Sequence, residues 1–596
     1  MHHFLAPGPW FSCVNVGYWS VAWIATAALL FVALRPVLAR SPGAREVGAS
    51  SPSVSFLGLA LLVIVAFRWP VFFYEFGRYF FGDNILAWNV DECQMLAGAL
   101  TMLHDPVPWR SVDPTTTGPL DIYFLMLPRL VGAPIAMGVT RVMTALLAWG
   151  TVAGVYLTLR EVGSERAARI GALPTALFVG FFTEWEIVFY TSEQLPLTLC
   201  IVGGWLLFAA MRRVGRPRVW RLAACGILLG AVPLAKLQLA PLAAWTGCFG
   251  LVWILASREQ TWRERVASAL PLVLGAAVVP VALLGWALAM GQGEHLWQSY
   301  VVNNLAYART SIPGSIYLRF LVRCPPALRL FALPVAAYGA LALAAFPLFR
   351  RVWWRLILYA VGSALAAGYA IMAPGKPFTH YFLLVGPTLG LWAGSLAGAS
   401  LDALRGPAGL TGRRRWAGGT ALVAFVLVCL VLQIVGRIVQ YPIFLDAQSF
   451  QVAAAENNLA WTIRQLAGPG ESLAIWGWEP VYHVKTGLRQ ATREAQSQRQ
   501  IEPGPQREYY RQRYLEDFRR SRPAVFLDVV GDINFGFNDR ERDGHETFPA
   551  LAAIVARDYV QAGDTLGVRI YARRDRVAEP ARSGAAGGAP ASGAVW

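Results

Sequence analysis

Apolar residues along this chain gather in long runs that are separated by shorter polar segments. A mostly apolar run of about 20 residues is long enough to cross the hydrocarbon core of a bilayer as a helix. The chain is therefore predicted to be a polytopic α-helical membrane protein with about twelve transmembrane helices. The number between residues 170 and 257 stays open, because two runs there are nearly continuous. The predicted helices lie near residues 14–37, 54–74, 136–159, 170–189, 192–211, 219–236, 238–257, 268–290, 328–349, 354–373, 379–400 and 417–440.

The pattern changes after residue 440. ESLAIWGW and PAVFLDVV are rich in alternating, β-branched or aromatic residues, which indicates strands, whereas REYYRQRYLEDFRRS is typical of a charged helix. We predict a small α/β domain here, followed by a disordered tail rich in Ala, Gly, Ser and Pro. The predicted domains are 1–53 (an extra N-terminal transmembrane helix and a cytoplasmic loop), 54–440 (a transmembrane module with an external loop at 75–135), 441–575 (the α/β domain) and 576–596 (the tail).

Arginine residues cluster in alternate loops between the apolar runs. Because Lys and Arg are enriched on the cytoplasmic side of membrane proteins, these loops are predicted to be cytoplasmic. The loops at 75–135, 291–327 and 374–378 then lie outside, together with the N-terminus and all of the chain after 440. The α/β domain is therefore predicted to be extracytoplasmic. The arginines of the cytoplasmic loops include Arg35, Arg160, Arg212, Arg258, Arg350 and Arg413.

Composition narrows the classes of function. Hydrophobic residues make up 56% of the chain and charged residues 15%, which excludes an ordinary soluble protein of this size. A net charge of +16 would suggest nucleic acid as the partner of a soluble chain, but topology accounts for these arginines, and no nucleic-acid partner is expected. The seven cysteines form no CxxC pair, so we expect neither a disulfide framework nor a thiolate metal site.

An acid-rich stretch at 89–120 lies in the predicted external loop, with one more acid, Asp121, just beyond it. Acids beside hydrocarbon are costly unless they face water, a cation or a substrate, so Asp91, Glu92 and Asp113 are candidate catalytic residues. One acid of the pair could take a proton from an acceptor group. Alternatively, Asp91 and Glu92 form a solvated pair at a helix start, where acids favour the helix dipole.

Two neighbouring segments of this stretch have features of their own. The turn at 115–120, TTTGPL, could bring backbone N–H groups close to a phosphate or a sugar, or it could be an ordinary turn before a helix. The segment MLAGALTML has helical spacing and could lie along the membrane surface as an amphipathic helix.

Further polar candidates occur at the predicted external ends of helices. Glu184 and Glu186 precede Glu193, and a polar hairpin tip is the preferred interpretation of the first two. A lysine or an imidazole at such a boundary can bind an anionic headgroup or a lipid-linked phosphate, or it can simply anchor the helix end. The candidate substrate-binding and phosphate-binding residues are Glu193, Lys236, Gln238, Arg309, Lys376, His380 and Tyr381.

Four motifs follow one another along the chain. They are the acid pair Asp91–Glu92, Asp113 with the turn Gly118–Leu120, the segment Lys376–Phe382 with Gly386–Pro387, and the pattern Trp476–Glu479, Tyr482, Thr486–Gly487 and Ala491–Arg493. In this order, the motifs resemble the GT-C class of integral-membrane glycosyltransferases, in the bacterial branch near the protein O-mannosyltransferases and the lipid A aminoarabinose transferase. The chain departs from the family where Gly118 replaces the first residue of the usual Pro-Pro-Leu turn, and where helix 14–37 precedes the family's first helix.

The resemblance implies that a sugar passes from a polyprenyl-phosphate-linked donor to an acceptor hydroxyl, with inversion, at the extracytoplasmic face of a bacterial inner membrane. It assigns the general base to Asp91 rather than Glu92, and it assigns stabilisation of the leaving lipid phosphate to Lys376, His380 and an arginine. The implied partners are the donor, membrane lipid, and a glycan, lipid or protein acceptor. No cofactor is assigned; some relatives hold a divalent metal ion on loop acids, which here would be Asp91, Glu92 and Asp113.

Two functions of other classes stay open. One is a transporter or flippase of an anionic lipid, and the other is a non-catalytic membrane scaffold whose external domain binds wall polymer. Transporters usually place charges near the bilayer midplane on broken helices, often within internal repeats. The acids of this chain cluster in a predicted external loop, and the sequence shows no repeat, so glycosyl transfer is the leading hypothesis.

Overall fold

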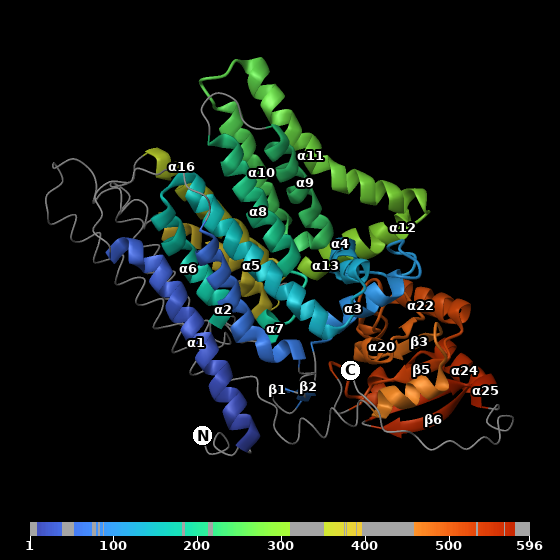
Figure 1. Ribbon diagram of the computed structural model, residues 1–596. Coiled ribbons are helices and arrows are strands. Elements are labelled where there is room, and N and C mark those ends of the chain that lie inside the picture. The colour runs from blue at the N-terminus through green and yellow to red at the C-terminus, as the bar shows by residue number, and fades with distance from the viewer. Residues whose placement is uncertain are drawn as a thin grey trace, which may run out of the picture. The chain divides into compact units, whose positions relative to one another are not determined.

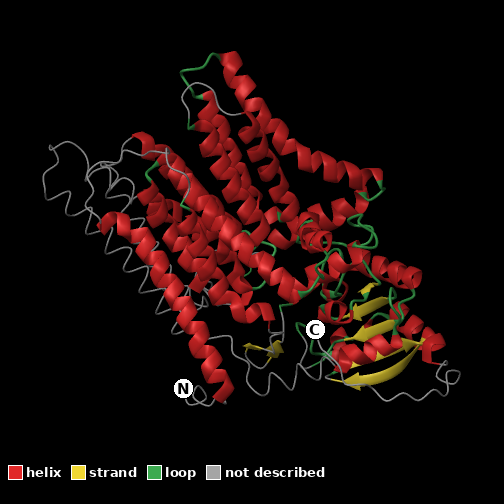
Figure 2. Ribbon diagram, viewed as in Figure 1, coloured by secondary structure: helices red, strands yellow, loops and turns green. Residues whose placement is uncertain are grey.

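The structure is a computed structural model, and its chain divides into two compact units. The first comprises residues 1–75 and 107–445, and the second comprises residues 76–106 and 446–596. The predicted external loop at 75–135 is thus shared between the two units, and each unit is described by itself. The structure describes residues 9–38, 53–73, 79–81, 84–86, 89–181, 185–212, 219–309, 351–374, 376, 378–388, 390–395, 458–531, 535–565 and 567–577 (Figures 1 and 2).

The described part of the first unit is helical, as Figure 2 shows. Its longer helices are α1 (Pro9–Leu38), α2 (Val54–Phe73), α5 (Met137–Val162), α6 (Glu165–Phe181), α8 (Gln194–Met211), α9 (Val219–Ala235), α10 (Ala240–Leu255), α11 (Trp262–Ala289) and α16 (Arg351–Met372). Short helical segments connect them: α4 (Pro119–Met126), η2 (Leu127–Val131), α7 (Trp185–Val188), η3 (Leu237–Leu239), α12 (Gly293–His295), η4 (Leu296–Val302), α13 (Asn303–Arg309) and η6 (Thr379–Leu384).

Within the described residues, five helices are long and apolar enough to cross a membrane. They are Met137–Val162, Gln194–Met211, Leu237–Leu255, Trp262–Ala289 and Trp353–Met372. Three shorter apolar helices accompany them, at Ser20–Leu34, Val54–Arg68 and Val219–Ala235. The protein is therefore a multi-pass membrane protein. The total of about twelve spans stays a prediction, because the segments near 328–349 and 417–440 lie outside the described residues.

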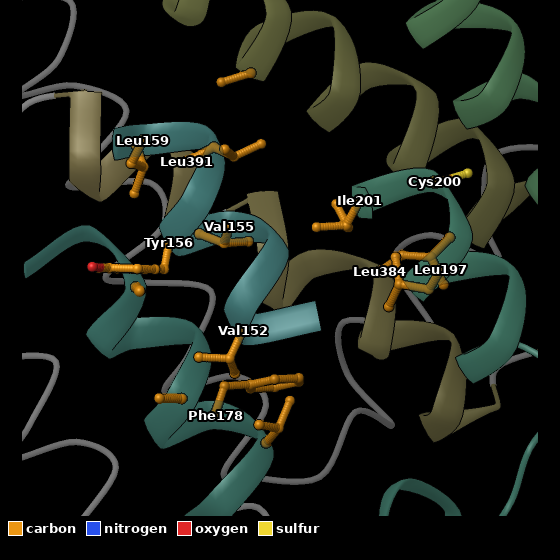
Figure 3. Packing of buried hydrophobic residues seen from close by; sticks show 14 of the residues in the cluster. Val152, Val155, Tyr156, Leu159, Phe178, Leu197, Cys200, Ile201, Leu384 and Leu391 are labelled. Atoms are coloured by element: carbon orange, nitrogen blue, oxygen red, sulfur yellow. The ribbon is translucent and has the colours of Figure 1, made fainter. Parts of the chain in front are cut away.

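Small residues let the helices of the first unit approach closely. α9 and α11 lie side by side (Figure 1), and a Cβ atom at Gly226, Gly230 or Gly275 would lie 2.1 to 2.3 Å from a carbonyl oxygen of the facing helix. Such close backbone contact replaces the hydrophobic driving force that helices lack inside lipid. Elsewhere, larger side chains fill the core between α5, α6 and α8 (Figure 3). The labelled core residues of these three helices are Val152, Val155, Tyr156, Leu159, Phe178, Leu197, Cys200 and Ile201.

The second unit contains a five-stranded mixed sheet with the strand order β4-β3-β5-β7-β6. β3 pairs in parallel with β4 and β5, whereas β7 pairs antiparallel with β5 and β6. The strands are β3 (Ser472–Trp476), β4 (Arg489–Gln490), β5 (Val525–Asp528), β6 (Tyr559–Thr565) and β7 (Val568–Arg573). The helices are α20 (Val481–Thr486), α21 (Gln498–Ile501), α22 (Arg507–Ser521), α23 (Arg540–Asp543), η7 (His545–Thr547), α24 (Pro549–Asp558) and α25 (Arg574–Val577).

β3 lies between β4 and β5, and β5 lies between β3 and β7, so both are central strands of the sheet. Every residue of both strands is buried, which explains their mostly apolar sequences. An additional two-stranded ribbon in this unit joins β1 (Tyr79–Phe81) to β2 (Asn84–Leu86). That the sheet and its helices lie outside the cell stays a prediction.

The helix α3 (Val90–Met102) corrects one expectation from the sequence. Its segment MLAGALTML is helical, but most of its 13 residues are buried. It packs against α20 and β4 within the second unit, and the N–H of Gln490 donates to the Thr101 hydroxyl at 2.9 Å. The apolar face of α3 is therefore covered by protein, so it is not a face that lies along the membrane surface.

Candidate active site

A turn at 113–118 fixes the short helix α4 in the first unit. Oδ1 of Asp113 accepts a hydrogen bond from the N–H of Thr115 at 2.8 Å, and Thr115 adopts a left-handed φ of 60°. The N–H of Gly118 then donates to the carbonyl oxygen of Ala235 at 2.6 Å. A Cβ atom at Gly118 would lie 1.9 Å from the carbonyl oxygen of Leu234, so only glycine fits.

This contact explains why the chain departs from the Pro-Pro-Leu pattern. A proline at 118 would have no N–H to donate to Ala235, and its ring would meet the same backbone. The glycine joins α4 to the end of α9, one residue before Lys236. The turn therefore has a structural role, because it holds α4 against the end of α9 and brings an acid on α4 toward Lys236.

That acid is Asp121, which is fully buried on α4. The hydroxyl of Tyr190 donates to Oδ1 of Asp121 at 2.7 Å. Oδ2 is also buried, and no described residue forms a hydrogen bond with it. Tyr190 is held over α4 by its ring, which stacks on Phe124 with centroids 6.2 Å apart.

The cation Lys236 follows directly after α9 and pairs with a buried acid. Its Nζ lies 2.6 Å from Oε1 of Glu193 and donates to the Ser192 hydroxyl at 2.5 Å. The Glu193 side chain is fully buried, and 10% of the Lys236 side chain is exposed. The Tyr381 ring lies beside the ammonium, with its centroid 6.0 Å from Nζ. Burying both charges is costly, and their mutual attraction offsets part of that cost.

His380 connects this pair to another carboxylate. Its Nδ1 lies 3.0 Å from Oε2 of Glu186, and its backbone N–H donates to the same oxygen at 3.1 Å. Its Nε2 lies 3.6 Å from Oε1 of Glu193. Each ring nitrogen thus faces a carboxylate. We call Asp121, Glu186, Glu193, Lys236 and His380 the buried charge cluster.

The acids of the buried charge cluster differ in their protonation. Burial raises the pKa of the Asp121 carboxyl well above its usual value, although the Tyr190 hydroxyl and the charge of Lys236 act against it. Burial also opposes the ionisation of Glu193, but the charges of Lys236 and His380 outweigh it and hold the pKa of Glu193 below its usual value. Within the cluster, the surroundings thus favour the ionised form of Glu193 and the protonated form of Asp121.

The structure brings together some of the residues that the sequence singles out. Glu193, Lys236, His380 and Tyr381 meet in or beside the cluster. The others have different surroundings or lie outside the described side chains. Gln238 donates to the carbonyl oxygen of Ala370 on α16 at 2.8 Å, Asp113 forms the turn before α4, Lys376 is exposed, and Arg309 and Glu184 have no described side chain.

Sequence reasoning missed three members of this region. The sequence pattern assigns no role to Asp121 or Tyr190, and it favours a polar hairpin tip for Glu186. Asp121 did carry a signal, because it is a lone acid within the apolar segment PLDIYFLM. Glu186 carried none, since its partner His380 is 194 positions away.

Asp91 and Glu92 lie in the second unit, in the first turn of α3. The Asn89 side chain caps this helix and accepts hydrogen bonds from the N–H groups of Asp91 and Glu92 at 2.8 and 3.0 Å. Their position at a helix N-terminus agrees with the dipole interpretation of the acid pair. Asp91 is partly exposed, whereas Glu92 is fully buried. Exposure makes Asp91 the more accessible of the two to a substrate.

One group of described side chains has the spacing of a metal site, namely Asp528, His545 and Glu546 in the second unit. Its carboxylates already have cationic partners. Oδ2 of Asp528 lies 2.5 Å from Nδ1 of His545 and 3.0 Å from Arg540, and Glu546 pairs with Arg569 at 2.9 Å. A metal ion would have to displace these cations, so an ion-pair network explains the group. A divalent metal ion on Asp91, Glu92 and Asp113 stays a prediction.

Comparison with known proteins identifies the fold of the chain. No family model matches the chain, and no curated protein matches it. Two solved structures of ArnT from Cupriavidus metallidurans do match, one bound to undecaprenyl phosphate and one in the apo state. They are 16% and 14% identical to this chain, each has a TM-score of 0.53, and each match covers 86% of this chain and 97% of ArnT. The chain therefore has the fold of ArnT, and the GT-C fold that the sequence motifs predict is confirmed.

Proposed function

We propose that this protein transfers a sugar from a polyprenyl-phosphate-linked donor to an acceptor hydroxyl. The observation that carries the proposal is the buried charge cluster, in which Lys236 pairs with Glu193 between two apolar helical segments. Ionisable groups in such surroundings are expensive, and they mark a substrate site by default. The fold supports the same conclusion, because the matching ArnT structure holds undecaprenyl phosphate.

Lys236 and His380 are the groups that we assign to the donor phosphate. A polyprenyl phosphate combines an anionic head with a hydrocarbon chain, and Lys236 lies between α9 and the apolar span Leu237–Leu255. An arriving phosphate would share the ammonium with Glu193 and place its negative charge near the His380 ring. As the bond from the anomeric carbon to the phosphate oxygen breaks, the phosphate keeps the electron pair, and these cations stabilise the charge. Lys376, which is exposed, and Arg309 are weaker candidates for the same role.

We assign the general base to Asp91, as the resemblance to GT-C glycosyltransferases implies. Its carboxylate would take the proton of the acceptor hydroxyl while the hydroxyl oxygen attacks the anomeric carbon with inversion. The partial exposure of Asp91 and the full burial of Glu92 support this choice. We further propose that the reaction occurs at the extracytoplasmic face of a bacterial inner membrane, with a glycan, a lipid or a protein as acceptor.

The test is transfer by the purified full-length protein in liposomes supplied with radiolabelled polyprenyl-phosphate sugars and an envelope extract as acceptor. The wild type should transfer label, and Asp91→Asn should lower the rate by a factor on the order of 10²–10⁴ while the protein still folds, because the amide cannot accept the proton. Asp564→Asn, at an exposed acid of β6, is the matched control. Unchanged transfer by Asp91→Asn would remove Asp91 as the base. Movement of the labelled donor across the bilayer without transfer would favour a flippase.

A further inference from the structure

The buried charge cluster holds three acids and two bases, and this imbalance requires an explanation. Glu193 is matched by Lys236 at 2.6 Å, and Glu186 is matched by His380 at 3.0 Å. Asp121 remains, and no described cation lies within ion-pair distance of it. If all three acids were ionised, the cluster would carry a net negative charge in a buried place, even with His380 protonated. A phosphate would then be repelled, so one acid must be neutral if this is a phosphate site.

The geometry identifies Asp121 as the neutral acid. Its Oδ1 accepts the Tyr190 hydroxyl, whereas Oδ2 is buried without a hydrogen bond among the described residues. A proton on Oδ2 therefore creates a buried O–H donor that still needs an acceptor. Buried donors are nearly always satisfied, by protein, water or a ligand. The titratable groups that face Asp121 are Tyr190, Glu193, Lys236 and Tyr300, and Lys236 is the cation among them.

We propose that Asp121 works as a neutral carboxylic acid whose Oδ2–H donates a hydrogen bond to the phosphate of the lipid-linked donor beside Lys236. This inference rests on the proposed function and adds a phosphate ligand to it. Glu193 already compensates the charge of Lys236, so an uncharged donor adds attraction without adding another buried charge. Burial acts in the same direction, since it raises the pKa of the Asp121 carboxyl.

The surrounding structure holds this donor in place. Gly118 fixes the start of α4 against the backbone at the end of α9, three residues before Asp121. Tyr190 contacts α4 twice, through the hydrogen bond to Asp121 and through its ring stacked on Phe124. Because Tyr190 occupies Oδ1, the carboxyl plane is set and the proton is directed to Oδ2. Tyr190 is thus a positioning residue that acts through Asp121.

The experiment measures binding of sugar-free undecaprenyl phosphate to the full-length protein in nanodiscs across a range of pH, without any transfer reaction. A group with a raised pKa holds its proton below that pKa and loses it above, so wild-type affinity should fall as pH rises. Asp121→Asn keeps an N–H donor and cannot ionise. At low pH it should bind undecaprenyl phosphate as the wild type does, and its affinity should not fall as the pH rises. Asp121→Leu has no donor and should bind on the order of tenfold more weakly at low pH.

Two further measurements separate this role from a purely structural one. Thermal unfolding checks that each variant folds, and Tyr190→Phe, which keeps the ring but loses the O–H, should shift the alkaline limb without abolishing binding. Infrared spectra without ligand should show the carbonyl stretch of a protonated carboxylic acid near neutral pH, and Asp121→Asn should remove it.

The outcomes are distinguishable. If the wild type binds undecaprenyl phosphate but Asp121→Asn keeps the alkaline loss, or Asp121→Leu binds as tightly as the wild type, the role of Asp121 is wrong and the proposed function survives. If the infrared spectrum of the wild type lacks the carbonyl band of a protonated carboxylic acid, the role of Asp121 is likewise wrong. If the wild type binds no undecaprenyl phosphate at any pH, the proposed function fails and this inference fails with it.

Discussion

Lys236 is the residue on which the proposed donor site depends most. Its ammonium is almost wholly buried, and it is held by Glu193, Ser192 and the ring of Tyr381. A lysine that only anchors a helix end would extend its charge into water. This side chain instead directs its charge into protein, toward an acid. Phosphate binding explains that arrangement better than anchoring does.

We predict that Lys236→Met lowers glycosyl transfer by a factor on the order of 10²–10³, since it removes the cation that stabilises the leaving phosphate. Lys376→Met, at an exposed lysine, should change transfer much less. The rate of transfer from the labelled donor in liposomes checks both.

The single change at Lys236 would also remove the lysine partner of the buried Glu193, and breaking a buried ion pair in this way destabilises a fold by about 3–5 kcal/mol. The double variant Lys236→Met, Glu193→Gln avoids this, because both charges are gone. If that double variant folds and transfers sugar at the wild-type rate, Lys236 does not hold the phosphate. If Lys376→Met loses more of the transfer rate than the double variant does, the donor site lies at the exposed Lys376.

At the scale of elements, the contact between α4 and α9 sets the position of Asp121. The helix α4 has only eight residues, so it cannot be stable by itself and depends on its contacts. The principal contact is between backbones, at Gly118 against Leu234 and Ala235. Since backbone atoms cannot change rotamer, a side chain at 118 must move a whole element.

We predict that Gly118→Ala lowers the free energy of unfolding by about 1–3 kcal/mol, the usual cost of forced overpacking, and weakens binding of undecaprenyl phosphate because α4 shifts. Its φ of −85° suits alanine, so the effect is steric alone. Thermal unfolding in detergent and the nanodisc binding assay measure the two effects.

Gly285→Ala provides the control. That glycine lies in α11 with nothing within 4 Å of its added Cβ, and alanine is the better helix former there. If the Gly118→Ala and Gly285→Ala proteins are equally stable, the contact between α4 and α9 is looser than the structure shows.

At the scale of the whole molecule, the chain combines a membrane unit with a sheet-containing unit that are not consecutive in sequence. Residues 76–106 belong with residues 446–596, so the acid pair on α3 and the buried charge cluster belong to different units. Orientation in the membrane is, in contrast, predicted from the arginines of alternate loops between the apolar helices. The helix α11 is the clearest case, because it is 28 residues long and has exposed acids beyond both ends.

We predict that the ends of α11 face opposite sides of the membrane. In a variant without the native cysteines, Glu259→Cys should react with a membrane-impermeant thiol reagent only from the cytoplasmic side, and Glu294→Cys only from the external side. Mass spectrometry after labelling of intact cells and of inverted vesicles reads out both. Labelling of both positions from the same side would contradict the assigned topology.

The class of protein and its fold could be predicted from the amino-acid pattern without any structure. Apolar runs long enough to span a bilayer are a local property, so they are visible without any contact being known. The motif order likewise indicated the GT-C fold, and Glu193, Lys236 and His380 were candidates from their place at helix ends. The strands β3 and β5 were also predictable, because ESLAIWGW and PAVFLDVV are rich in β-branched and aromatic residues.

Tertiary structure alone decided which of these residues meet. Glu186 pairs with His380 from 194 positions away, and no periodicity carries information over that distance. The raised pKa of Asp121 depends on burial and, to a smaller extent, on the charge of Glu193 from another element, and both exist only once the helices pack. The grouping of α3 with β4 and α20 is equally invisible in a linear pattern, because a packed face looks the same as a membrane-facing one.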